Sequence, residues 1–110
     1  MINTVDLDVK PAGQYAYFAA RDAHIRNYAN STKFSDKERL RAEQIKLGLG
    51  MVYTSSNIFV NYRQKFITVK VCNGTVKNKQ NLSLLEQDYE KEGITKIVTN
   101  QGIVYRIPKT

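Results

Sequence analysis

Hydrophobic and polar residues alternate most regularly in the middle of the chain. The alternation covers Ile58–Tyr62 and then Phe66–Cys72, and a period of two residues is typical of half-buried strands. Asn73 and Gly74 follow at once, and both residue types tolerate the positive φ angles of a type I′ turn. We therefore expect Phe66–Cys72 to fold back on Thr75–Asn78, with Ile58–Tyr62 as a third antiparallel strand.

The N-terminal part is expected to hold a strand followed by a helix. Apolar and polar residues alternate over Met1–Lys10, and Pro11 ends the pattern because proline has no N–H for a sheet ladder. The charged residues on one side of this strand indicate a solvent-facing strand or a strand at an edge of the sheet. The alanine-rich stretch Ala12–Ala29 then predicts a helix.

A capping box predicts the second helix. Ser35 and the glutamate three residues later match the Ser-x-x-Glu pattern, so we expect a helix over Asp36–Leu47 with Gly48 as its C-cap. A short strand over Gly50–Ser56 is expected to follow. Opposite faces of the helix both carry apolar residues, so the pattern leaves open which face packs on the protein. These residues are Leu40 and Leu47 on one face and Ala42 and Ile45 on the other.

The C-terminal part predicts a third helix and a hairpin. Apolar residues recur at helical spacing over Leu82–Glu92, and the next residue is a glycine. Ile94–Thr99 and Ile103–Ile107 then flank a short loop that ends in Gly102, which is typical of a hairpin. The whole chain is therefore expected to be one α+β domain. It would contain two N-terminal helices, a central antiparallel sheet of about three strands, a third helix and a C-terminal β-hairpin.

A winged-helix variant is the alternative fold, with Leu82–Glu92 as the last helix and the hairpin as the wing. This helix carries four acids and a single lysine, so phosphates would repel it. Contact with nucleic acid would then come from Lys96 and Arg106 in the wing, or from the N-terminal helices.

Positive charge is concentrated in one part of this chain of net charge +7. No acid lies between Glu43 and Glu86, a stretch that contains six lysines and arginines. Cations on strands and turn tips neutralise phosphates and release counterions, and neighbouring tyrosines add stacking. The candidate nucleic-acid-binding residues are Arg63, Lys65, Lys70, Lys77 and Lys79 in the sheet region, and Arg21, Arg39, Arg41, Tyr17 and Tyr28 in the helices.

These charges predict a small cytoplasmic nucleic-acid-binding accessory or regulatory protein, with DNA ahead of RNA and without enzymatic activity. A protein-interaction module or inhibitor that docks on an acidic partner is the alternative, because the same charges would guide that encounter. A small ribonuclease is the third function, with His24, Tyr28 or Arg63 acting on the phosphate. In the simplest interpretation, the lysines are solvated charges that protect sheet edges.

Other kinds of chemistry have little support in the residues. One cysteine, Cys72, and one histidine, His24, cannot make a zinc site of the usual spacing, and no glycine-rich phosphate loop is present. We expect no cofactor, no metal and no catalytic residue. A single cysteine favours a reduced, cytoplasmic setting, and no apolar run or signal pattern predicts a membrane contact. The Met1–Lys10 edge strand would allow a homodimer.

Overall fold

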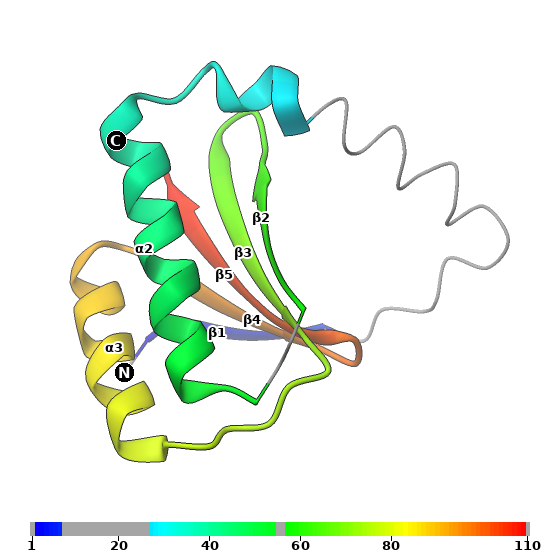
Figure 1. Cartoon of the computed structure of the whole chain (residues 1–110), viewed down its shortest axis with the longest axis vertical. Coiled ribbons are helices and arrows are strands. Elements are labelled where there is room, and N and C mark those ends of the chain that lie inside the picture. The colour runs from blue at the N-terminus through cyan, green and yellow to red at the C-terminus, as the bar shows by residue number, and fades with distance from the viewer. Residues whose placement is uncertain (1, 8–26, 55–56, 110) are drawn as a thin grey trace, which may run out of the picture.

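A computed structural model describes residues 2–7, 27–54 and 57–109. These residues form an α+β domain in which α2 and α3 lie on one face of a five-stranded mixed sheet (Figure 1). The elements in chain order are β1 (Thr4–Leu7), α2 (Asp36–Val52), β2 (Ile58–Tyr62), β3 (Phe66–Cys72), α3 (Lys79–Lys91), β4 (Thr95–Thr99) and β5 (Gly102–Pro108). Residues 27–31 are also helical.

The strand order is β1-β4-β5-β3-β2. β1 runs parallel to β4, and the three other pairs are antiparallel. The expectation of about three strands is therefore wrong, because the C-terminal hairpin is not a separate unit but lies in the middle of the sheet. The structure does not confirm the winged-helix alternative, since β4 and β5 are also paired on their outer sides, with β1 and β3.

The core fills the space between the sheet and the two helices. Val69 and Val71 of β3 are fully buried there together with Ile45 and Leu49 of α2. Burial of one such side chain contributes about 1.5–3 kcal/mol. The alternation predicted for β3 is confirmed, because the residues between these valines point to the other face of the sheet.

The expected hairpin after β3 is wrong. β3 already has β2 and β5 as neighbours, so neither of its edges is free for Thr75–Asn78. Asn73 does adopt the positive φ of 51° that its position suggested. The chain then runs to the C-terminal end of α2, where the Thr54 N–H donates to the Thr75 carbonyl at 2.8 Å and the Lys77 N–H donates to the Val52 carbonyl at 2.8 Å.

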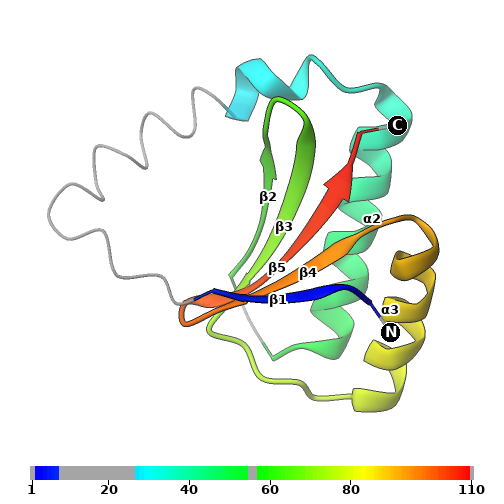
Figure 2. The ribbon, with the colours of Figure 1, turned by 180° about the vertical axis from the view of Figure 1, so that it is seen from behind.

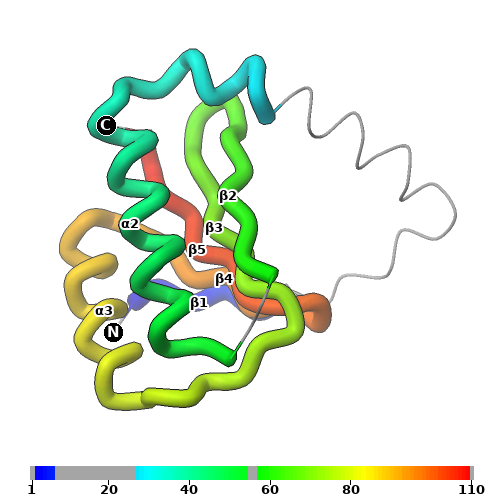
Figure 3. The backbone as a smooth tube through the Cα atoms, in the orientation of Figure 1, coloured from blue at the N-terminus to red at the C-terminus, as the bar shows by residue number. Residues whose placement is uncertain are grey.

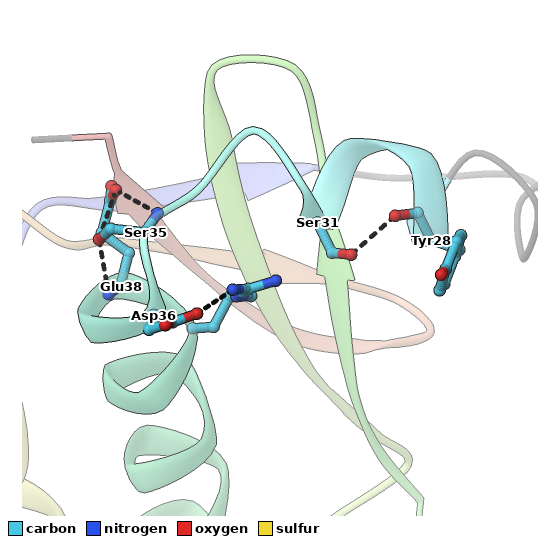
Figure 4. Close-up of polar contacts among 6 residues, drawn as sticks. Tyr28, Ser31, Ser35, Asp36 and Glu38 are labelled. Carbon is cyan, nitrogen blue, oxygen red and sulfur yellow. Dashed lines mark hydrogen bonds and ion pairs between the residues drawn. The ribbon is translucent and has the colours of Figure 1, made fainter.

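The capping box at the start of α2 is confirmed (Figure 4). The Glu38 N–H donates to the Ser35 Oγ at 3.2 Å, and the Ser35 N–H donates to the Glu38 Oε1 at 3.0 Å. The predicted C-cap at Gly48 is wrong, because the helix continues to Val52 and includes the start of the strand expected over Gly50–Ser56. A Cβ at Gly48 would lie 3.4 Å from the Oη of Tyr89, an ordinary van der Waals distance, so α2 packs directly against α3 at this point.

The remaining predicted elements fall close to those observed. β1 lies within the predicted Met1–Lys10 strand and is at an edge of the sheet. α3 begins three residues before the expected Leu82, capped by Asn78, whose Oδ1 accepts from the Asn81 N–H at 3.0 Å. Most of the Ala12–Ala29 helix lies outside the described residues.

Side-chain amides cover the outer edge of β2, which is the other edge of the sheet. The Asn27 Nδ2 donates to the Val60 carbonyl at 3.4 Å, and the Tyr62 N–H donates to the Asn27 Oδ1. The Asn30 Nδ2 donates to the Tyr62 carbonyl at 3.0 Å. The Asn27 amide thus pairs with β2 as a backbone peptide group would, and it occupies hydrogen-bonding groups that an edge strand usually leaves free.

Candidate nucleic-acid interface

The sheet turns its other face away from α2 and α3 (Figure 2). Strand alternation and the cross-strand register decide which residues this face carries. One row across the strands is Asn61, Thr68, Arg106 and Thr95, and the next row is Phe59, Lys70, Val104 and Ile97. We call these residues, together with Phe66 of β3, the distal face.

The distal face carries two cations and no carboxylate among its residues. The Arg106 guanidinium lies over the Phe66 ring, with 4.6 Å between its Cζ and the ring centroid. The Lys70 Nζ is 3.5 Å from the Gln101 Oε1, a neutral acceptor. The described strands contain one acidic residue, Asp6. It pairs with Val98, whose side chain is on the helix side of the sheet, so Asp6 is on that side too. Neither cation is therefore neutralised by an acid of the described sheet.

Aromatic rings stand next to both cations. Phe59 is directly opposite Lys70 in the register of β2 and β3, and its side chain is 52% exposed. Phe66 is half-buried beneath Arg106. An exposed phenylalanine beside a lysine on a sheet is suited to stacking on a base while the cation contacts a phosphate.

The β2–β3 turn extends this surface at one end. Arg63 and Lys65 are exposed in the turn, which the Arg63 N–H closes by donating to the Phe66 carbonyl at 2.9 Å. Tyr28 is 79% exposed, and Figure 4 shows its ring pointing away from the hydrogen bond between its carbonyl and Ser31. It belongs to the helical residues that border β2, so it stands near the same edge of the sheet.

Two predicted cations lie at the opposite end of the sheet. Figure 3 shows the β2–β3 turn and the segment before α3 at the two ends of β3. Seven residues of β3 separate them, which corresponds to about 24 Å at roughly 3.4 Å per residue. Lys77 is exposed in that segment, and Lys79 lines a pocket between α3 and β1 on the helix side. They therefore do not join Arg63 and Lys65 in one patch.

The predicted arginines of α2 are matched with acids. Arg39 pairs with Asp36 one turn earlier. The Arg41 Nε donates to the Glu92 Oε1 at 2.7 Å, and this bond raises the pKa of Arg41, while burial acts in the other direction. The Arg41 pair joins α2 to the end of α3, so it stabilises the helix layer.

The other helix residues proposed from the sequence, Tyr17 and Arg21, lie outside the described residues, as does His24. Sequence reasoning did not include Phe59 and Phe66 among the candidate residues, and it considered Arg106 only as a wing residue of the winged-helix alternative. A signal was present: in the predicted alternation of β2, Phe59 falls in the polar phase, and a large aromatic residue there is unusual.

A buried polar chain links the core to the pocket between α3 and β1. The hydroxyls of Tyr53 and Tyr105 are 2.9 Å apart, and the Tyr105 hydroxyl donates to the Glu86 Oε1 at 3.1 Å. The Lys96 Nζ donates to the same oxygen at 2.8 Å. Burial raises the pKa of both tyrosines, most strongly that of Tyr105. The phenols therefore stay protonated at neutral pH and serve as structural hydrogen-bond partners rather than as bases.

Neither a metal-binding cluster nor a membrane-spanning helix is found within residues 2–7, 27–54 and 57–109. No group of three or more side chains there could hold a metal ion. No helix in these ranges is both long enough and apolar enough to cross a membrane. Comparison with known proteins finds no match among family models, curated proteins or solved structures.

Proposed function

We propose that this protein binds nucleic acid on the distal face, and that it binds single strands more tightly than duplexes. The observation that supports this most is the arrangement of Phe59, Lys70, Phe66 and Arg106 on one sheet face without a carboxylate. This keeps the nucleic-acid function expected from the sequence and moves it from one patch of cations to a mixed aromatic and cationic surface.

Single strands fit such a surface for a physical reason. Their bases are free to stack on an exposed ring, and one stacked base contributes about 1–3 kcal/mol. Bases of a duplex are already stacked on each other, so Phe59 would gain little from them. Lys70 and Arg106 would contact phosphates, and the exposed Arg63 and Lys65 would continue the phosphate path beyond the sheet.

The test is fluorescence anisotropy with three labelled probes: single-stranded RNA, single-stranded DNA and duplex DNA. Phe59→Ala is expected to weaken single-strand binding about tenfold at unchanged salt dependence, because stacking involves no counterions. Lys70→Ala with Arg106→Ala should weaken binding and flatten the log–log salt slope by about 1.4, from two lost contacts at about 0.7 each.

Lys77→Ala with Lys79→Ala is the matched control, since it removes the same charge at the other end of the sheet. It should leave single-strand affinity within about twofold in salt near 0.15 M, where charges separated by more than about 8 Å are screened. Equal losses in both double variants would refute the distal face as the site. Absence of binding to all three probes at about 50 mM salt would refute the proposed function.

A further inference from the structure

The solvent side of α2 carries a second apolar stripe. Leu40, Leu47 and Met51 are 60%, 70% and 74% exposed, while Ala42, Ile45, Leu49 and Val52 on the opposite side are buried. The structure thus decides which face of α2 packs on the protein, and it leaves the other apolar face without cover from the described residues. Large apolar side chains grouped in this way mark an interaction surface.

The spacing of this stripe is that of a coiled-coil seam. Leu40, Gln44, Leu47 and Met51 follow one another at intervals of four, three and four residues, as the core positions of a heptad do. A seam of this kind needs another helix as its partner, because knobs of one helix fill holes of the other.

Gly50 gives independent support for a close neighbour. It lies inside α2 at an exposed position with an ordinary helical φ, where glycine costs about 1 kcal/mol relative to alanine. Among the described residues, the nearest atom to a Cβ added there would be the Ile58 Cδ1 at 3.8 Å, so none of their contacts requires glycine. A glycine on this flank of the stripe lets a second backbone approach closely.

The stripe is complementary to itself. If two copies of α2 pack antiparallel about a two-fold axis, Leu40 meets Met51 of the partner subunit, and Gln44 meets Leu47 of the partner subunit. Glu43 and Lys46 lie on one flank and would form reciprocal ion pairs across the axis. Neither makes an ion pair with another described residue of its own chain, so both are available for this contact.

We propose that the solvent side of α2 is the contact surface of a homodimer in which the two α2 helices run antiparallel. The proposal is independent of nucleic-acid binding. It places both sheets outside the helices, so that the two distal faces point away from each other.

Sedimentation equilibrium over a range of protein concentrations tests the dimer. The wild type should reach the mass of a dimer, and Leu47→Lys with Met51→Lys should weaken association at least about 100-fold, because it places like charges in the seam. Glu43→Lys and Lys46→Glu should each weaken it about threefold to fivefold, and the two combined should restore it. A wild type that stays monomeric at all concentrations would overturn the proposal.

Disulfide cross-linking in a Cys72→Ser background tests the antiparallel register. Leu40→Cys with Met51→Cys should form a covalent dimer on mild oxidation, because these positions face each other across the axis. Each single variant should not, since Leu40 and Met51 lie about 16 Å apart along the helix, which separates identical positions beyond disulfide reach. Cross-linking of Leu40→Cys alone would overturn the antiparallel arrangement.

Discussion

Gly102 offers the sharpest test of the sheet order. It begins β5 with a φ of 145°, a conformation that residues with a side chain rarely adopt. A Cβ at this position would overlap the Val71 carbonyl oxygen and lie 3.1 Å from the Cα of Cys72. Both atoms belong to the backbone of β3, which cannot move aside without breaking the pairing at the centre of the sheet.

Gly102→Ala should therefore be strongly destabilising. Backbone strain of this kind costs about 1–3 kcal/mol, and overpacking against rigid neighbours costs about 1–3 kcal/mol. The expected loss of unfolding free energy is about 2–6 kcal/mol, a large part of the roughly 5–15 kcal/mol that stabilises a typical domain. Urea unfolding followed by circular dichroism would show a lower midpoint at an unchanged slope.

Gly50→Ala is the matched control, measured in the Leu47→Lys, Met51→Lys background so that association does not contribute. The same chemical change at an open helical position should raise the unfolding free energy by about 0.5–1 kcal/mol. If the unfolding free energy of Gly102→Ala stayed within about 1 kcal/mol of the wild-type value, which is below the expected loss, β5 would not approach β3 as described.

Three further predictions concern the helices and the buried tyrosines. Ser35→Ala should lower the unfolding free energy by about 1 kcal/mol in urea titrations, because the capping box loses its side-chain acceptor. A double-mutant cycle of Arg41→Ala and Glu92→Gln should give a coupling of about 0.5–1 kcal/mol, since the pair is partly exposed, and a value near zero would contradict a helix-joining role. Burial raises the pKa of Tyr89 to about 12, so native Tyr89 holds its proton while the unfolded phenol loses it from about pH 10. The contribution of Tyr89 to stability is then fully present below pH 10 and falls by about 1.4 kcal/mol per pH unit between pH 10 and 12, and Tyr89→Phe should reduce the total slope by that amount.

Local chemistry made much of this fold predictable from the sequence. The start of α2 follows from Ser35 and Glu38, and the phase of β3 follows from its alternating valines, because each signal acts within a few residues. The strand order was not predictable, since it depends on contacts between distant segments. Nothing near Asn73 shows that β5 occupies the edge of β3 that a local hairpin would have used.

The candidate site also combines residues that local sequence signals indicate with residues that only the tertiary fold brings together. Arg63, Lys65 and Lys70 are candidates proposed from charge alone, but Arg106 comes from a strand that only the tertiary fold brings beside β3. The pairing of Arg41 with Glu92 is a contact between residues far apart in the chain, so the sequence could not show that this charge is already neutralised.

The two edges of the sheet have a consequence for how copies of this protein can associate. Asn27 and Asn30 occupy three hydrogen-bonding groups on the outer edge of β2, namely the Val60 carbonyl and the N–H and carbonyl of Tyr62, whereas β1 is the terminal strand on the other side. A β-ribbon that can grow from both ends polymerises without limit, but one that can grow from a single end terminates after its first addition. Replacing these two amides would therefore expose the backbone groups that they cover on β2 and give neighbouring copies a second edge on which to pair.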